Sequence, residues 1–332
     1  MTLSEVLGHE RAIRSLRAAV VAKRPAHAYL ISGPTGVGKG TLARAFLASL
    51  LCDAPGNGDA CGTCAQCVRV AADTHPDVRM VQRDEDRRDV RTEQAREVTR
   101  WLTLRPLMAA RKIAVIEDAE CLNEHGQNAL LKTLEEPPGA ATLLLVATHE
   151  SLLLPTVRSR CQRIALDPLA AEIVDRFLVD RGVAPDLRAT IVARAEGAPG
   201  RAVVLLEDPH AEARQRMLDQ LGRLTSATAA DLSAVAQALG RDDAGVALET
   251  VVSWYRDVLA LAVDGPDAPV RNADTLPALR LAATHADVPQ VLRALETVCD
   301  TIRTVERNAN KVLALETMLL SLRQIDRTGD TY

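Results

Sequence analysis

The chain has 332 residues, of which 47% are hydrophobic and 25% are charged, and its 40 basic and 44 acidic side chains give a net charge of -4. This composition is typical of a globular protein of two or three domains, each large enough to fold without disulfides. The slightly acidic balance and the 2% of aromatic residues argue against a protein that binds nucleic acid by itself, because excess positive charge and base-stacking side chains are both lacking.

Membrane and secreted proteins are disfavoured as well. The longest apolar runs, such as residues 143–147 and 202–206, fall far short of the roughly 20 residues of a membrane-spanning helix. The N-terminus carries Glu5 and Glu10 and lacks the basic start and apolar core of a secretory signal. We therefore expect a cytoplasmic protein without a membrane partner.

The first half of the chain alternates between short apolar runs and helical periodicity, which is typical of parallel strands joined by crossover helices. Three runs are apolar almost throughout and predict strands that are buried on both faces: 28–32, 112–116 and 143–148. After Asp167, apolar residues recur every three or four positions to the end of the chain. We therefore expect an α/β fold in the first half and helices in the second.

Turn-forming residues divide the helical half. Gly197-Ala198-Pro199-Gly200 interrupts the helical pattern, and Glu207-Asp208-Pro209 predicts a linker. We predict three domains, which are an α/β domain at residues 1–166, a small helical domain at 167–208 and a larger helical domain at 209–332.

A glycine-rich loop follows the first predicted strand and precedes a predicted helix. Its sequence is Gly33-Pro34-Thr35-Gly36-Val37-Gly38-Lys39. Glycines let backbone amides surround a polyphosphate, the helix N-terminus adds a positive field, and the lysine binds the outer phosphates. The loop therefore predicts a site for ATP or ADP with Mg²⁺, and the alternative is a turn with a chance lysine. The expected nucleotide contacts are Gly33, Thr35, Gly36, Gly38, Lys39, Gly40 and Thr41.

One position of this loop departs from the usual pattern. A serine or threonine that ligates Mg²⁺ commonly follows the lysine, but here Gly40 follows it and Thr41 comes one residue later. Successive helix residues point about 100° apart, so Thr41 replaces the missing hydroxyl only if the turn has another shape. Nucleoside monophosphate kinases carry the same Gly-Lys-Gly-Thr sequence, and a small-molecule kinase is therefore one alternative function.

Two acidic residues directly follow the second predicted strand. The end of a buried parallel strand is where the Mg²⁺ of a bound nucleotide lies, and Glu117-Asp118 resembles a Walker B motif with its two acids in reverse order. Glu117 is then expected to face the metal and Asp118 to act on the attacking water. Because a displacement of about 1 Å can slow catalysis about a hundredfold, this order predicts that nucleotide binding survives better than hydrolysis. The alternative is a pair of solvated acids at a strand end.

Four of the seven cysteines lie close together, which in a chain without an export signal indicates a metal site rather than disulfides. Cys52, Cys61, Cys64 and Cys67 have the spacing C-x8-C-x2-C-x2-C, with glycines for the tight turns between them. Four thiolates complete a tetrahedral site, so we predict structural zinc, the alternative being four free thiols. His75 is close in sequence, but it precedes a proline in a predicted loop, and we expect it to be a bystander.

Two polar positions follow the third strand. Thr148 stands where a side chain can sense a terminal phosphate. Farther along, Arg158-Ser159-Arg160-Cys161 follows an exposed-looking proline. From residue types alone, these arginines are either ordinary surface residues or groups that reach the nucleotide of a neighbouring subunit, where one arginine can accelerate phosphoryl transfer about 10³- to 10⁵-fold.

Together these motifs resemble those of the AAA+ subunits of the bacterial clamp loader, which opens the sliding clamp for DNA polymerase III. The most specific segments are the cysteine spacing, residues 90–96, residues 127–138 with the sequence QNALLKTLEEPP, and Ser159-Arg160-Cys161. The resemblance implies an AAA+ P-loop domain with a zinc module at residues 52–67, a small helical lid domain and an all-α collar domain. It also implies that Arg160 enters the ATP site of the adjacent subunit.

The resemblance further implies the cofactors and partners. These are structural zinc, ATP or ADP with Mg²⁺, the gamma/tau motor and delta subunits, the sliding clamp, and primed DNA reached through the assembly. The chain would be a component of a DNA-directed DNA polymerase, a nucleotidyltransferase, with weak or no ATPase activity of its own.

The departures from the motor pattern favour the delta-prime branch of the family. Motor subunits have a sensor arginine where this chain has Gly200. Arg201 comes one position late, and we include it among the candidate nucleotide contacts. The chain also lacks the long extension of the tau motor. We therefore predict a stator that supplies Arg160 in trans. The alternative within the family is a gamma/tau-type motor that hydrolyses ATP with Thr41, Glu117 and Asp118.

Overall fold

The computed structural model describes residues 1–83, 90–207, 210–240, 243–306 and 309–328, so the predicted domain limits at 208, 209 and 332 lie outside the described residues. The chain forms two compact units. The first contains residues 1–177 and 196–201, and the second contains residues 178–195 and 202–332. The division into three domains stays a prediction.

The first unit is built on a parallel sheet with the strand order β2-β3-β4-β1-β5. Two of the predicted strands have the expected limits, and the third begins two residues earlier and ends one residue earlier than expected. Two further strands at the edges of the sheet were not expected. The strands are β1 (Ala28–Ser32), β2 (Val78–Val81), β3 (Lys112–Ile116), β4 (Ala141–Ala147) and β5 (Gln162–Ala165).

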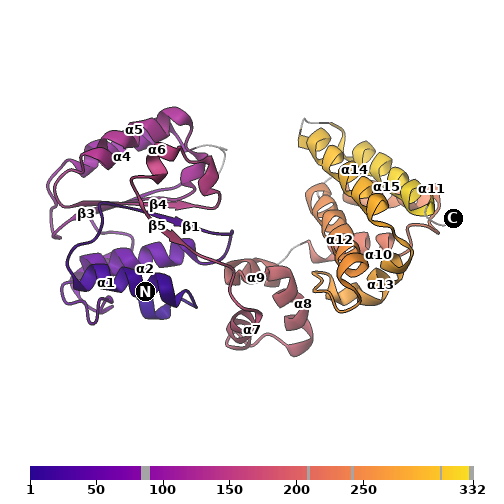
Figure 1. Cartoon of the computed structure of the whole chain (residues 1–332), viewed down its shortest axis with the longest axis horizontal. Coiled ribbons are helices and arrows are strands. Elements are labelled where there is room, and N and C mark those ends of the chain that lie inside the picture. The colour runs from indigo at the N-terminus through magenta and orange to yellow at the C-terminus, as the bar shows by residue number, and fades with distance from the viewer. Residues whose placement is uncertain (84–89, 208–209, 241–242, 307–308, 329–332) are drawn as a thin grey trace. The chain divides into compact units, whose positions relative to one another are not determined.

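Helices cover both faces of this sheet, as Figure 1 shows. On one face, Tyr29 and Ile31 of β1 pack in a core with residues of α1 and α2, where Tyr29 and Phe46 meet edge to face. On the other face, Leu30 packs in a core with residues of α4 and α5. Both faces are therefore buried, which explains why the three central strands are continuous apolar runs.

The helix after β3 begins at a capping side chain. Asn123 accepts a hydrogen bond from the backbone N–H of Gly126 (2.8 Å) and so starts α5, and Pro137 follows two residues after that helix ends. The helices are α1 (Glu10–Val21), α2 (Lys39–Leu51), α3 (Ala65–Ala71), α4 (Thr92–Leu102), α5 (Glu124–Glu135) and α6 (Pro155–Arg158), with short 3₁₀ turns η1 (Leu3–Glu5), η2 (Ala119–Cys121) and η3 (Glu150–Leu152).

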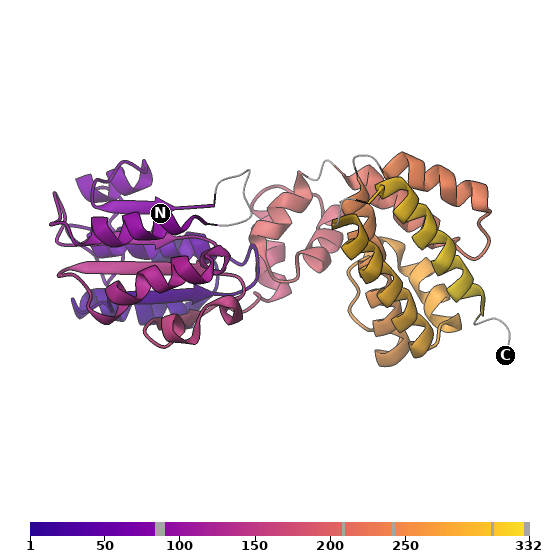
Figure 2. The same ribbon diagram turned by 90° about the horizontal axis from the view of Figure 1, so that it is seen from above.

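The remainder of the chain is helical in its described residues. In the second unit, the long helix α12 carries Trp254 and Tyr255 into a core that also contains residues of α10, α11, α14 and α15, and the last two helices pack side by side (Figure 2). No helix among the described residues is long and apolar enough to cross a membrane. The helices are α7 (Ala171–Val179), α8 (Pro185–Ala195), α9 (Pro199–Leu206), α10 (Ala211–Leu221), α11 (Ala229–Leu239), α12 (Ala244–Asp264), α13 (Leu276–His285), α14 (Val288–Glu306) and α15 (Lys311–Thr328), with the turn η4 (Ala273–Thr275).

A buried carboxylate shapes the loop that leads into β3. Asp77, just before β2, is fully buried, accepts hydrogen bonds from the backbone N–H groups of residues 107–109 at 2.7–2.9 Å, and lies 3.6 Å from Nζ of Lys112. Burial alone would raise the pKa of Asp77, but these N–H groups and the charge of Lys112 outweigh it and hold the pKa below its usual value. The loop is thereby fixed, and it exposes Leu104, Leu107 and Met108.

We expect Asp77→Asn to lower the free energy of unfolding by about 2–4 kcal/mol at pH 7, because it leaves Lys112 buried without a negative partner. A carboxylate whose pKa is depressed by folding stabilises the protein above the unfolded pKa, near 4, and this contribution is lost as the pH falls through the folded pKa. The difference between the two proteins should therefore shrink below about pH 4.

Urea unfolding at several pH values measures this difference. Glu97→Gln is the matched control, because Glu97 forms an exposed ion pair with Arg79 (3.0 Å), and we expect a change of less than about 0.5 kcal/mol. If Asp77→Asn lowers the free energy of unfolding no more than Glu97→Gln does, or if its effect does not depend on pH, the stabilising role of Asp77 is wrong.

Candidate nucleotide site and cysteine cluster

The candidate nucleotide residues meet at the carboxyl ends of the central strands because these strands are parallel and in register. Ser32 pairs with Ala147, and Ile116 pairs with Leu145 two positions earlier on β4. Gly33, Glu117 and Thr148 each directly follow one of these strand ends. The backbone N–H of Gly33 donates to the carbonyl of Ala147 (3.3 Å), which joins the glycine loop to β4.

The glycine loop leads directly into α2. Gly38 has a φ of 107°, a left-handed conformation that favours glycine, and its carbonyl accepts the N–H of Leu42 at the start of the helix (2.9 Å). Thr35 and Thr41 are both exposed. His9, which sequence reasoning did not single out, directly precedes α1 and contacts the loop through its Nε2 and the carbonyl of Val37 (3.1 Å).

Lys39 is buried at the base of the loop. Its Nζ donates hydrogen bonds to the carbonyls of Gly33 (2.7 Å) and Pro34 (2.9 Å) and to Oγ1 of Thr148 (3.1 Å). Burial lowers the pKa of Lys39, and the nearby charges of Glu120 and Asp118 oppose that shift. The two residues expected to face the terminal phosphate, Lys39 and Thr148, are thus in direct contact.

The two acids after β3 lie in different surroundings. Glu117 faces the start of α2, where a Cβ atom added to Gly40 would lie 3.8 Å from its Oε1. Its other oxygen accepts a hydrogen bond from Nε2 of Gln82 (3.0 Å), and Arg44 of α2 lies 3.9 Å from Oε1. Asp118 is exposed and has a left-handed backbone, with a φ of 48°. Glu117 is therefore the acid that faces α2, and the residue of α2 opposite it has no side chain.

A third acid, Glu120, holds the loop after β4. Its Oε1 accepts the backbone N–H groups of Thr148 (2.7 Å) and His149 (3.3 Å), and its Oε2 is buried without a hydrogen-bond partner among the described residues. Sequence reasoning assigned this acid no role because only the first two residues after the strand matched a motif. The contact joins the end of β3 to Thr148 and, through it, to Lys39.

The start of α9 packs directly on the glycine loop. The backbone N–H of Gly200 donates to the carbonyl of Gly36 at 2.8 Å. A Cβ atom at Gly200 would lie only 2.9 Å from that carbonyl oxygen, and one at Gly36 would lie 2.6 Å from the backbone nitrogen of Arg201. A side chain at Gly200 would therefore require the glycine loop to shift. The guanidinium of Arg201 forms an ion pair with Glu196 (2.8 Å).

Arg160 lies in the turn between α6 and β5. Its Nη2 is 2.8 Å from Oε1 of Glu135, and its Nη1 donates to the carbonyl of Thr156 (2.9 Å). About a third of its side chain is exposed. Among the described residues, its polar partners belong to α5 and α6 and not to the glycine loop of the same chain.

The four predicted cysteines come together. The Sγ atoms of Cys52, Cys61, Cys64 and Cys67 all lie within 4.8 Å of one another. Backbone N–H groups point at three of these sulfurs, as in metal–thiolate turns: those of Cys61 and Cys64 lie 3.3 Å from the Sγ atoms of Cys52 and Cys61, and that of Cys67 lies 3.5 Å from Sγ of Cys64. Hydrogen bonds from the N–H groups of Thr63 and Cys64 lower the pKa of Cys61 to about 6, whereas burial raises that of Cys67 to about 12. This donor set suits a tetrahedral zinc ion.

His75 does not join the cluster. Its Nε2 contacts Oε1 of Gln66 (2.8 Å), and its Nδ1 accepts the backbone N–H of Asp77 (3.1 Å). Because both ring nitrogens have partners, His75 has no nitrogen left for a metal in this arrangement.

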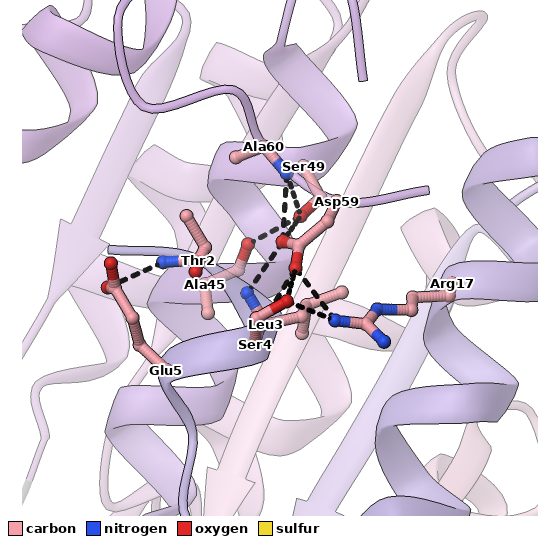
Figure 3. A network of polar contacts seen from close by, with 9 residues as sticks. All are labelled: Thr2, Leu3, Ser4, Glu5, Arg17, Ala45, Ser49, Asp59 and Ala60. Carbon is pink, nitrogen blue, oxygen red and sulfur yellow. Dashed lines mark hydrogen bonds and ion pairs between the residues drawn. The ribbon is translucent and has the colours of Figure 1, made fainter. Parts of the chain in front are cut away.

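A second carboxylate ties the cysteine loop to the rest of the unit, as Figure 3 shows. Asp59 lies between the first and second cysteines and accepts hydrogen bonds from the backbone N–H groups of Leu3 (2.7 Å) and Ser4 (2.8 Å) and from Nη2 of Arg17 (2.8 Å). Burial opposes its ionisation, but the hydroxyl of Ser4, which donates to Oδ2 (2.6 Å), and the donors named above lower the pKa of Asp59 to about 2. The sequence offered no signal for it, since a single aspartate in a loop fits no motif.

Comparison with known proteins decides the family. A family model described as DNA polymerase III, delta subunit, matches residues 8–170, and a second, described as the C terminal part of that subunit, matches residues 209–324. The DNA polymerase III subunit delta' of Pseudomonas aeruginosa is 30% identical over 92% of this chain and 94% of its own length. This chain belongs to the delta-prime subunit family of DNA polymerase III.

A further relative agrees with this assignment, and a solved structure shares the fold. The delta' subunit of Escherichia coli is 30% identical over 85% of this chain and 87% of its own length. A DNA polymerase III gamma subunit-related protein from Thermotoga maritima superimposes with a TM-score of 0.55 over 95% of this chain and 99% of that protein, at 17% identity. The parallel α/β sheet followed by helices is thus the AAA+ fold of clamp loader subunits, as the sequence motifs predicted.

Proposed function

We propose that this delta-prime family member acts as the stator of its clamp loader and supplies Arg160 to the ATP site of a neighbouring subunit. The observation that carries this proposal is the position of Arg160, on a partly exposed turn whose polar partners are Glu135 and Thr156. An arginine that approaches a transferring phosphoryl group stabilises its charge without touching the rest of the nucleotide. The partner is then a gamma/tau-type motor subunit.

The chain's own glycine loop is proposed to bind ATP or ADP with Mg²⁺ but to support hydrolysis poorly. The backbone of residues 33–41 and Lys39 supply the phosphate contacts. Glu117 faces Gly40, which offers no hydroxyl to a metal, and Arg44 competes for the same carboxylate. Asp118 is exposed, and a base must lie within hydrogen-bond reach of the water it activates. These features favour a stator over a motor.

The cysteine cluster is proposed to bind one structural zinc ion through Cys52, Cys61, Cys64 and Cys67. Four thiolates leave no open position for a substrate. The zinc would brace residues 52–67, a segment that Asp59 already ties to the N-terminus and to α1.

The remaining partners are proposed to be the delta subunit, the sliding clamp and, through the assembly, primed DNA. The loop held by Asp77 exposes Leu104, Leu107 and Met108, and 76% of the Leu107 side chain is accessible. Large apolar side chains that are exposed close together are typical of a surface that binds another protein. We propose that this loop contacts a protein of the same assembly.

The test of the stator role is Arg160→Ala, assayed as ATP turnover by the assembly reconstituted with motor and delta subunits. We expect turnover to fall because a positive charge at the neighbour's nucleotide is lost. The assembly should remain intact by gel filtration, because Val157 and Cys161 hold the turn in the core and the exposed contacts of Arg160 with Glu135 and Thr156 add little to stability. Arg163→Ala is the matched control, since Arg163 is an exposed arginine of β5 that pairs with Glu150. Unchanged turnover in Arg160→Ala would show that the finger role is wrong.

The zinc site is tested by metal analysis of protein purified without chelator. We expect about one zinc per chain, and much less in Cys64→Ser, because a three-thiolate site binds the ion more weakly. Cys299→Ser is the control, since Cys299 is an exposed cysteine of α14, outside the cluster. Metal-free protein in which all four thiols are reduced would contradict the assignment.

A further inference from the structure

Helix α5 ends with a glutamate, Glu135, at the helix end where a negative charge is unfavourable. The C-terminal end of a helix carries partial negative charge, which makes a carboxylate there unfavourable unless a cation lies near it. That cation is Arg160, whose Nη2 is 2.8 Å from Oε1 of Glu135. The sequence motif that contains Glu135 gave it no role.

Arg160 has a second anchor on the other side of its guanidinium. Its Nη1 donates to the carbonyl of Thr156, four residues earlier. Because the two anchors hold two different nitrogen atoms of one planar group, they fix the plane and the direction of the guanidinium together. The remaining N–H groups bond to no described residue, so they stay available to a ligand.

The ion pair is not needed to attach the turn to the domain. Val157 and Cys161 flank Arg160 in this turn, and both are buried in the core that contains Leu130 and Leu134 of α5. An ion pair between partly exposed side chains adds little to stability in comparison with such packing. Glu135 therefore has more effect on where the guanidinium points than on how the turn folds.

We propose that Glu135 is a positioning residue that aims Arg160 toward the ATP site of the neighbouring subunit. This inference rests on the proposed function of Arg160 in trans. A guanidinium that is already held in one direction loses less freedom when it meets the transferring phosphoryl group, and such preorganisation raises the rate of the chemical step. Glu135 itself does not touch the nucleotide.

The experiment uses the complete reconstituted assembly and compares Glu135→Gln, Arg160→Ala and the double variant at saturating ATP. The difference in kcat between wild type and Arg160→Ala defines the Arg160-dependent turnover. We expect Glu135→Gln to reduce this part about two- to fivefold, as expected for an ion pair of this exposure, with an unchanged KM for ATP. In the Arg160→Ala background, Glu135→Gln should have no further effect.

Two further variants separate positioning from a structural role. Glu135→Asp keeps the charge and should recover part of the turnover. Glu136→Gln is the matched control, because Glu136 is the adjacent exposed glutamate and forms no ion pair with a described residue. Thermal unfolding and assembly should be the same for all of these proteins.

The outcomes separate this inference from the proposed function. If Arg160→Ala lowers turnover and Glu135→Gln does not, the positioning role is wrong and the finger role stands. A rise in turnover in Glu135→Gln would also overturn the inference, since the carboxylate would then restrain Arg160. An equal loss in the Arg160→Ala background would overturn it too, because Glu135 would act without Arg160. If Arg160→Ala has no effect, both ideas fall.

Discussion

The candidate nucleotide site depends on the parallel, in-register pairing of β1, β4 and β3. This pairing brings Gly33, Thr148 and Glu117 together at the carboxyl ends of these strands although they are far apart in sequence. A chain of contacts then runs along these strand ends, from Glu120 to the backbone of Thr148, from the hydroxyl of Thr148 to Lys39, and from Lys39 to the carbonyls of the loop. The strands therefore position the site residues as much as the loop does. A change in strand register would separate these residues.

The same loop is also where the chain departs from a motor. Gly36 and Gly200 meet backbone to backbone, and a side chain at Gly200 would require the glycine loop to shift. Gly40 removes the hydroxyl opposite Glu117. Under the proposed function, Gly200 and Gly40 stand where a motor subunit would carry side chains that act on the nucleotide. They are the reason that we propose nucleotide binding with weak hydrolysis.

The sequence predicted the parts of the molecule that follow a short pattern. The three central strands could be found because burial on both faces makes them apolar almost throughout, and the cysteine cluster follows from local spacing. The edge strands β2 and β5 could not be found in this way, since they are short and only partly buried.

Long-range polar contacts were the other feature that the sequence could not predict. Asp59 forms hydrogen bonds with residues more than 40 positions away. Glu135 at the end of α5 forms an ion pair with Arg160 in the turn between α6 and β5. No periodicity marks such pairs, because only the folded chain brings them together. The identity of Arg160 as a candidate came from the family resemblance, and its partner came from the structure.

The central claim is that this chain does not itself drive ATP turnover. The most direct measurement compares ATP hydrolysis by the purified chain alone with that of the assembly, using native protein and Lys39→Ala, which removes the main charge from the phosphate loop. The account predicts no measurable hydrolysis by the chain alone and nearly unchanged turnover when only this subunit carries Lys39→Ala. Robust hydrolysis by the isolated chain, abolished by Lys39→Ala, would contradict the account and make the chain a motor.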